Sequence, residues 1–486
     1  MRKVWFILGL FVVQLAPAFA QDSLPVFEEA ACPFTLPAGE TVTCGYLTVP
    51  EVRAEKSTRT VTLAVAILHA HSETPESDPV VYLAGGPGGS ALFDVASWVD
   101  MPFRAQRDLI LFDQRGTGFS RPTLDCFSLN GLSETPQGCR DRLARQGINL
   151  AAYNSAASAA DLNDLRLALG YEHWNLLGIS YGTRLALTAI RDYPAGIRSV
   201  ILDSTYPPEV NSYVEQSQHK LRAFEALFAG CAADPDCASA YPDLEAVFYE
   251  LVDTLNEQPA AYYVEIAGAA FQRVLDGDDL VDSLFHGLYS TALIPYLPHV
   301  IYQVYEGNYA IVSQLDSGAL SGMALRQDAR DAIHSEGVFN SVECYEELPF
   351  NEREAVFAAV ELAPPALYDS FVADADLMFT LCKTWDVGAA GQIETQPVVS
   401  DIPALVLAGE YDPVTPPVWG QQAAQNLSQS FYYEFPGVGH SVIDAGDCPR
   451  AIAAAFLDNP STAPDAGCLE AMTGPDFVVL PETQPR

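Results

Sequence analysis

"NLLGISYGTRLAL", residues 175–187, places one serine between two glycines where an apolar run passes into a helix-like pattern. Residues 178–182, GISYG, match G-x-S-x-G, in which small neighbours let a serine project from a sharp strand-to-helix turn. Apolar residues at helical spacing continue to Ile190. We therefore predict that Ser180 is a catalytic nucleophile. The alternative is a structural serine at a crowded turn.

Short apolar, β-branched runs that end in glycine or aspartate recur around this turn. They are VTLAVAIL from Val61, VVYLAGGPGG from Val80, LILFDQRGTG from Leu109, NLLGISYG from Asn175 and SVILDST from Ser199. Such runs are typical of buried strands in a largely parallel sheet. Helical spacing over residues 155–169 separates the third run from the fourth, so the order is strand, helix, strand. This order predicts an α/β layer architecture.

The strand pattern stops at TYPPEV, residues 205–210, and returns with IPALVLAGEYD from Ile402. The residues in between are aromatic-rich and helix-like without clear strand runs, which indicates an inserted, mostly helical cap. The expected organisation is a signal peptide over 1–20, an α/β core over 21–210, a helical cap over 211–397 and the rest of the core over 398–486.

The first residues have the features of a secretory signal peptide. Arg2 and Lys3 precede an apolar stretch from Val4 to Leu15, and small residues follow up to Ala20. The stretch has about 12 residues, whereas a helix needs roughly 20 to cross a bilayer. We expect cleavage near Ala20-Gln21 and a mature chain without a membrane span, in the periplasm or the medium.

The composition disfavours several classes of partner. The chain has 486 residues, 49% of them hydrophobic, which suffices for a large core and more than one folding unit. Its formal net charge of -38 disfavours nucleic acids and anionic membranes, because both repel an acidic protein. The sequence does not indicate an oligomeric state.

All 10 cysteines follow the expected cleavage site. In an exported protein an even number indicates disulfides, although connectivity stays open and buried free thiols are the alternative. Pairing of sequence neighbours joins Cys32 with Cys44, Cys126 with Cys139, Cys231 with Cys237, Cys344 with Cys382, and Cys448 with Cys468. The sequence contains no CxxC or HExxH, and we interpret His69 and His71 as strand-end residues, so we expect no metal.

A serine hydroxyl at neutral pH needs a base to accept its proton and a third group to orient that base. His440, in PGVGHSV after the last predicted strand, is the candidate base. Asp412, in LAGEYDPVTPP after the preceding strand, is the candidate acid. Both lie where the carboxyl ends of parallel strands gather. Asp203, in ILDST, also follows a strand and is the rival acid.

Acyl transfer also needs hydrogen-bond donors aimed at the developing oxyanion. AGGPGGS, residues 84–90, directly follows a predicted strand, and its glycines permit a close backbone approach. We assign the backbone amides of Gly86 and Tyr181 as the two donors. The alternative is a plain glycine turn.

Several segments together resemble the α/β-hydrolase peptidases, the group of the prolyl iminopeptidases and the secreted tripeptidyl aminopeptidases. They are GGPGGS, DQRGTGFSRP, GISYGTRLA, VILDSTYPP, AGEYDPVTPP and GVGHS, and SVECYEELPF around Cys344 resembles the cysteine-containing secreted branch. The resemblance implies the α/β-hydrolase fold with a cap and a TAP-like C-terminal segment. It also implies that Asp113 and Arg115 brace loops near the site. Prolyl iminopeptidases usually have histidine where this chain has Ala84, which points away from that subgroup.

A peptidase that acts at a free N-terminus must compensate the substrate ammonium with carboxylates. Glu343, Glu346 and Glu347 in the predicted cap are the candidates, and a solvated acidic face is the alternative. We expect a secreted serine hydrolase without a cofactor that acts on a peptide or small acyl substrate through an acyl-enzyme. An esterase or lipase with the same triad and a catalytically silent binding protein are the alternatives.

Overall fold

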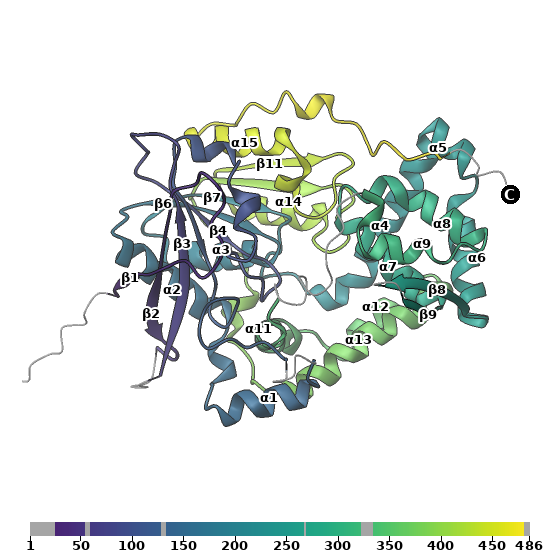
Figure 1. Cartoon of the computed structure of the whole chain (residues 1–486), viewed down its shortest axis with the longest axis horizontal. Coiled ribbons are helices and arrows are strands. Elements are labelled where there is room, and N and C mark those ends of the chain that lie inside the picture. The colour runs from purple at the N-terminus through teal and green to yellow at the C-terminus, as the bar shows by residue number, and fades with distance from the viewer. Residues whose placement is uncertain (1–24, 54–58, 128–132, 267–268, 322–333, 481–486) are drawn as a thin grey trace, which may run out of the picture.

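The computed structural model describes residues 25–53, 59–127, 133–266, 269–321 and 334–480. In these residues a nine-stranded sheet is flanked by helices, and a largely helical body lies beside it (Figure 1). The signal peptide predicted for residues 1–20 lies outside the described residues.

The sheet has the strand order β1-β2-β3-β5-β4-β6-β7-β10-β11. Neighbours from β5 to β11 run parallel, whereas β1, β2, β3 and β5 pair antiparallel. The largely parallel sheet is therefore confirmed. Its strands are β1 (Phe27–Glu29), β2 (Val42–Pro50), β3 (Thr60–Leu68), β4 (Val80–Leu83), β5 (Leu109–Phe112), β6 (Trp174–Ile179), β7 (Ile197–Asp203), β10 (Ala404–Gly409) and β11 (Ser430–Phe435).

The central strands are largely apolar and buried because both faces of the sheet are covered. Successive residues of a strand point to opposite faces. In β7, Val200 and Leu202 therefore join one buried cluster while Ile201 joins another. The helices next to the sheet are α2 (Ser155–Leu169), α3 (Tyr181–Asp192), α14 (Pro417–Asn426) and α15 (Asp447–Asp458), whereas α1 (Pro136–Arg145) packs on a helix of the insertion.

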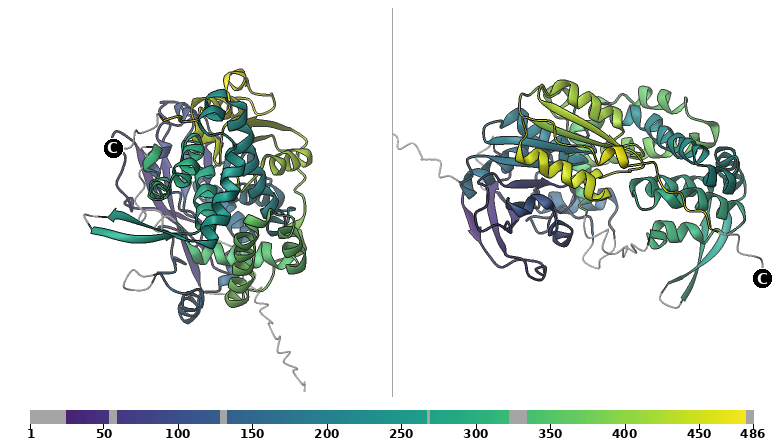
Figure 2. Two further views of the ribbon diagram at one scale, coloured as in Figure 1. Left: turned by 90° about the vertical axis from the view of Figure 1, so that its right-hand side faces the viewer. Right: turned by 90° about the horizontal axis from the view of Figure 1, so that it is seen from above.

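Between β7 and β10 the chain forms a helical body with a core of its own, seen beside the sheet in Figure 2. Phe224, Phe248 and Leu284 are fully buried in that core. The helices between these strands are α4 (Ser212–Ala233), α5 (Pro235–Ala240), α6 (Leu244–Glu257), α7 (Gly277–Tyr289), α8 (Leu297–Tyr305), α9 (Ile311–Asp316), α11 (Glu336–Val342), α12 (Arg353–Val360) and α13 (Pro365–Trp385). The domain boundaries given above remain predictions.

A two-stranded hairpin interrupts the insertion where the sequence shows no clear strand runs. Its strands are β8 (Ala260–Ile266) and β9 (Ala269–Leu275), and they pair antiparallel. Tyr263 is 66% exposed and Val274 59% exposed. Because neither face of the hairpin is buried along its length, its apolar residues do not alternate with polar ones, and the periodic signal of a half-buried strand is missing.

The second half of the insertion packs on the sheet as well as on the helical body. Val338 and Val342 of α11 and Trp385 at the end of α13 belong to the buried cluster that contains β7 and α3. Trp385 is fully buried, and its indole nitrogen donates to the hydroxyl of Ser341 at 3.0 Å. The inserted residues therefore serve two cores, and only one of them is separate from the sheet.

Five disulfides connect sequence neighbours and use all ten cysteines. The pairs are Cys32–Cys44, Cys126–Cys139, Cys231–Cys237, Cys344–Cys382 and Cys448–Cys468, which is the sequential pairing given above. Among the helices that the structure describes, none is both long and apolar enough to cross a membrane.

Candidate active site

Ser180 lies in a sharp turn between β6, which ends at Ile179, and α3, which begins at Tyr181. Its φ of 58° is a left-handed conformation that is unfavourable for a residue with a side chain. The turn is crowded: a Cβ atom on Gly178 would clash with the carbonyl of Gly182, and one on Gly182 with the carbonyl of Leu83. The two glycines of G-x-S-x-G are therefore steric requirements of this turn.

His440 and Asp412 form a direct hydrogen bond. His440 Nδ1 lies 2.8 Å from Asp412 Oδ2, and the histidine ring is 12% exposed while the aspartate is fully buried. Asp412 also accepts from the amides of Val414 and Thr415 at 2.9 Å each and from the Thr415 hydroxyl at 2.7 Å. One carboxylate is thus held in place from several directions.

Within this pair the pKa of His440 is raised and the pKa of Asp412 is lowered, as a general base and its orienting acid require. Burial disfavours the imidazolium of His440, but the charge and hydrogen bond of Asp412 outweigh burial and raise the pKa of His440. Burial likewise opposes ionisation of Asp412, and His440 and Thr415 hold the pKa of Asp412 below its ordinary value. The arrangement keeps an ionised carboxylate against an imidazole that can accept a proton.

The segments that carry Ser180 and His440 are both hydrogen-bonded to the backbone or side chains at the carboxyl end of β7. The amide of Ser180 donates to the carbonyl of Asp203 at 3.0 Å, and the amide of Ser441 donates to Ser204 Oγ at 2.9 Å. Among the described residues, Ser180 Oγ has no hydrogen bond to His440. Such a bond is often long in ligand-free hydrolases and tightens when substrate binds.

Asp203, the rival acid, contacts the backbone that follows the histidine. Its two carboxylate oxygens accept from the amides of Val442 and Ile443, each at 2.8 Å. Burial raises the pKa of Asp203 to about 7 despite these bonds. Because Asp412 holds the imidazole nitrogen, the geometry favours Asp412 as the orienting acid and Asp203 as an anchor of the loop.

The predicted oxyanion loop packs against the nucleophile. A Cβ atom on Gly85 would lie 2.9 Å from Ser180 Cβ, and Gly86 has a φ of 116° that favours glycine. Gln114 Nε2 donates to the carbonyl of Ala84 at 2.9 Å. Tyr181 is the first residue of α3, so its amide has no acceptor within the helix. The loop and the helix start therefore lie on two sides of Ser180.

Asp113 and Arg115 both have bracing contacts. Asp113 accepts from Ser90 Oγ at 2.7 Å and from the amide of Phe119 at 2.7 Å, and burial raises its pKa to about 6. Arg115 forms an ion pair with Asp161 at 2.7 Å. Asp113 thus fixes the end of the glycine loop, whereas Arg115 connects the segment 113–115 to α2.

The three candidate glutamates lie in one π-helical turn, Glu343–Glu347. Glu346 accepts from the amide and hydroxyl of Ser155 at 2.5 and 2.6 Å, and Glu347 from Arg184 at 3.0 Å. Glu343 accepts from the Tyr213 hydroxyl at 2.7 Å, and burial and the neighbouring Glu347 raise its pKa to about 7. Two of the three carboxylates are therefore occupied within the protein, and the solvated-face alternative does not fit, because all three are buried.

Arg184 is a buried residue of the site that the sequence does not predict. It lies one turn after Ser180 on α3, 3.0 Å from Glu347 and 3.6 Å from Glu346, and 5.0 Å from the ring centroid of Tyr206. Burial lowers its pKa, but Tyr206 and the glutamates outweigh burial and raise it. The available signal was a charged residue close after the nucleophile in the predicted helix.

The insertion reaches the catalytic loop directly. The amide of His440 donates to the carbonyl of Tyr289 at 3.0 Å, and their rings lie 5.1 Å apart edge to face. The amide of Gly439 donates to Thr291 Oγ1 at 3.1 Å. The end of α7 therefore helps to position the imidazole of His440. This contact joins segments that are far apart in the sequence, so no local sequence pattern predicts it.

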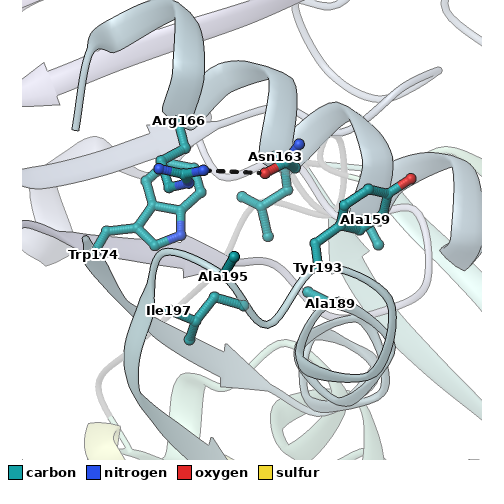
Figure 3. A pocket seen from close by; sticks show the side chains of 9 residues that line it. Ala159, Asn163, Arg166, Trp174, Ala189, Tyr193, Ala195 and Ile197 are labelled. Carbon is teal, nitrogen blue, oxygen red and sulfur yellow. Dashed lines mark hydrogen bonds between the residues drawn. The ribbon is translucent and has the colours of Figure 1, made fainter. Parts of the chain in front are cut away.

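Two hollows lie away from Ser180, Asp412 and His440. One, of about 10 Å³, lies at the amino ends of β6 and β7, where Trp174 and Ile197 line it (Figure 3). That volume holds one water at most. The other, of about 440 Å³, lies between α4, α5 and α6, with Phe228 and Tyr241 in its wall. The predicted catalytic residues thus lie at the carboxyl ends of the strands, whereas the smaller hollow lies at their amino ends.

Two family models match the chain. The model described as alpha/beta hydrolase fold matches residues 78–307, which include Gly86 and Ser180. The model described as TAP-like protein matches residues 368–468, which include Asp412 and His440. The two matches thus contain the predicted nucleophile, base and acid.

Curated relatives carry both peptidase and esterase names. Serine protease Hip1 of Mycobacterium tuberculosis is 26% identical over 456 residues, covering 87% of this chain and 86% of that protein. Carboxylesterase B of the same species is 27% identical over 416 residues, covering 77% and 76%. A tripeptidyl aminopeptidase of Streptomyces coelicolor is 29% identical over 210 residues, covering 37% and 38%.

Proposed function

We propose that this chain, a serine hydrolase with the α/β-hydrolase fold, is an exported exopeptidase that releases residues from the free N-terminus of peptides. The observation that carries the proposal is the TAP-like match over residues 368–468, because it includes both members of the bonded pair Asp412 and His440. The relatives named serine protease and tripeptidyl aminopeptidase support the same substrate class.

In the proposed mechanism Ser180 Oγ attacks the scissile carbonyl while His440 Nε2 accepts the hydroxyl proton. The amides of Gly86 and Tyr181 stabilise the oxyanion of the tetrahedral intermediate. Asp412 holds the imidazole in the tautomer that accepts at Nε2. His440 then protonates the leaving amine, and a water molecule repeats the sequence on the acyl-enzyme, regenerating Ser180.

Glu343 is the best of the three candidate glutamates for the substrate ammonium. Glu346 and Glu347 already compensate the charge of Arg184, whereas the hydrogen bond that Glu343 accepts from the described residues comes from a neutral hydroxyl. A bound ammonium offsets the cost of ionising a buried carboxylate. Because the pKa of Glu343 is about 7, this interaction weakens as the pH falls below 7.

An esterase is the second candidate, and the relative named Carboxylesterase B favours it. The two activities share the same carbonyl chemistry, so the residues of the triad do not distinguish them. Alanyl and tripeptidyl arylamides compared with p-nitrophenyl acetate separate the two candidates. Turnover of the ester alone would reject the peptidase.

Labelling with a fluorophosphonate tests the nucleophile. The wild-type protein is expected to be labelled and Ser180→Ala to remain unlabelled, since the hydroxyl that attacks phosphorus is gone. Ser90→Ala, which changes a buried serine near the same glycine loop, is the control for labelling of other hydroxyls. Equal labelling of wild type and Ser180→Ala would remove Ser180 from the mechanism.

Glu343→Gln tests the amine site. The KM for an unblocked alanyl arylamide is expected to rise by roughly tenfold or more, because a buried charge pair is lost. The KM for p-nitrophenyl acetate, which has no amine, is expected to stay the same. If both substrates respond alike, Glu343 acts on the fold and not on the ammonium.

Export is supported by the cysteines. The structure contains five disulfides. Disulfides form and persist in oxidising compartments and are rare in the cytosol. Fractionation of cells that express the whole chain, with mass determination of the mature N-terminus, tests both the compartment and the predicted cleavage near Gln21.

A further inference from the structure

One inserted segment packs on the glycine loop that contains Gly86 and is connected to Tyr181 through Ser155. Residues 334–347, here named the brace, run from His334 through α11 to the π-helical turn. We propose that the brace positions the oxyanion hole, holding Gly86 at one end and Tyr181 at the other. This inference rests on the proposed function, because it concerns the same two donors.

At its first end the brace clamps the glycine loop. The amide of Ser335 donates to the carbonyl of Gly88 at 2.9 Å, and His334 pairs with Gly89 as an antiparallel bridge. A Cβ atom on Gly86 would lie 3.2 Å from His334 Cε1, so the imidazole covers this glycine closely. Burial lowers the pKa of His334, which keeps the ring neutral beside the loop. The loop is therefore held by backbone bonds and by a ring.

At its other end the brace holds the start of α3. Glu346 accepts from Ser155 Oγ at 2.6 Å, and that hydroxyl lies 2.8 Å from the hydroxyl of Tyr181. Tyr181 is 1% exposed, so its ring has little freedom to move. Arg184, one turn further along α3, pairs with Glu346 and Glu347. These contacts thus fix the start of α3, which carries Tyr181, the second donor.

The two ends are parts of one continuous helical segment. α11 passes without a break into the π-helical turn, and π-helical turns are frequent at functional sites. Cys344 joins the brace to α13 through its disulfide with Cys382, and Gly337 donates to the carbonyl of Leu124 at 3.1 Å. A shift of the brace therefore displaces both donors relative to Ser180.

This arrangement matters because oxyanion donors act only when they are in place before the charge develops. A displacement of about 1 Å in a catalytic constellation can cost roughly 100-fold in rate. Loss of a positioning contact is therefore expected to lower kcat while substrate affinity is kept. A segment that serves only the fold would not produce this separation.

The test uses His334→Ala and Glu346→Gln, assayed with p-nitrophenyl acetate, which reports on the site whether the natural substrate is a peptide or an ester. For each variant kcat is expected to fall about 10- to 100-fold, with KM within about threefold. Inhibition by phenylboronic acid, whose tetrahedral adduct occupies the oxyanion hole, is expected to weaken by a similar factor. His173→Ala, 56% exposed, and Glu361→Gln, also exposed, are the matched controls.

A further variant separates positioning from direct catalysis. His334→Phe keeps a flat ring over Gly86, so it is expected to recover most of the kcat that His334→Ala loses. Fluorophosphonate titration counts the folded active sites, so kcat refers to intact enzyme even where a variant is less stable. The proposal fails if kcat and phenylboronic acid inhibition are unchanged in both variants, or if His334→Gln recovers activity and His334→Phe does not. Loss of labelling in Ser180→Ala stands whatever these variants show, so the proposed nucleophile and the brace are judged separately.

Discussion

Three serines with left-handed backbone conformations surround the site. Ser180, Ser204 and Ser441 have φ values of 58°, 55° and 66°. Each such residue costs about 1–3 kcal/mol, which a fold sustains only where neighbours fix the conformation. Here the end of β7 does so, since it bonds the backbone of Ser180 through Asp203 and that of Ser441 through Ser204. Strain is concentrated where the nucleophile and base must be aimed.

Asparagine variants of the two aspartates are expected to differ. Asp412→Asn should lower kcat roughly 10,000-fold, because an amide stabilises the wrong imidazole tautomer. Asp203→Asn leaves His440 with its acid and should reduce kcat less. It places an NH2 group against a backbone amide, at a cost of about 1–3 kcal/mol of stability. Steady-state kinetics and urea unfolding of both variants test this. A larger kcat loss for Asp203→Asn would reverse the two roles.

The pH dependence of kcat/KM tests the charges around His440. The imidazole must be neutral to accept a proton, and its pKa is raised above the ordinary 6.5 by Asp412, Asp203 and Asp444 acting against burial. The acid limb is therefore expected above pH 6.5. Asp444→Asn removes one of these carboxylates and should move the limb to lower pH, whereas Asp447→Asn, which changes a nearby acidic residue that is not one of these three, should leave it in place. An unchanged limb in Asp444→Asn would contradict this electrostatic account.

The sequence identifies residues whose role depends on a local turn. Ser180, Asp412 and His440 each follow an apolar strand, and the ends of parallel strands gather at one edge. Arg184 and His334 could not be assigned in this way. Their partners lie far along the chain, and only the folded structure brings an arginine to Glu347 or an imidazole to Gly86.

At the scale of elements, the same distinction separates the sheet from the insertion. Strands buried on both faces read as continuous apolar runs, so β4, β5, β6 and β7 were predictable. The β8–β9 hairpin was not, because its exposed side chains carry no period. Nor does the helical spacing of α11 show that it packs on the sheet cluster, since an amphipathic pattern indicates a buried face without naming its partner.

The disulfide of the brace is expected to affect stability and rate together. Cys344 and Cys382 are 38 residues apart and Cys231 and Cys237 only 6. Loop entropy predicts losses of about 4 and about 2 kcal/mol when each pair is changed to serine. Only the Cys344/Cys382 double variant should also lower kcat, because only that pair touches the brace. Equal kcat losses in the two double variants would show that the brace has no particular effect on kcat.

For the whole molecule, charge and burial act on stability in the same direction. The chain carries a formal net charge of -38, and self-repulsion of a highly charged chain disfavours the compact state. Independently, burial raises the pKa of Asp113 to about 6 and those of Asp203 and Glu343 to about 7. These three carboxyls are each hydrogen-bonded close to the site, so the site and the stability of the fold depend on pH together.

The free energy of unfolding is therefore expected to fall as the pH rises from 5 to 8. A carboxyl whose pKa is higher in the folded state than in the unfolded chain contributes stability at low pH, and that stability is lost as the pH rises through the folded value, here between about 6 and 7. Asp412, whose pKa is lowered, contributes stability that is already complete above pH 5, so it does not oppose the trend. Salt separates the two causes, since it screens surface repulsion but hardly reaches buried groups. At high salt the thermal unfolding midpoint should still fall with rising pH, but less steeply than at low salt. Asp113→Asn should make this remaining fall smaller. A midpoint that does not fall from pH 5 to 8 at either salt concentration would show that these carboxyls ionise in the folded chain as freely as in the unfolded one.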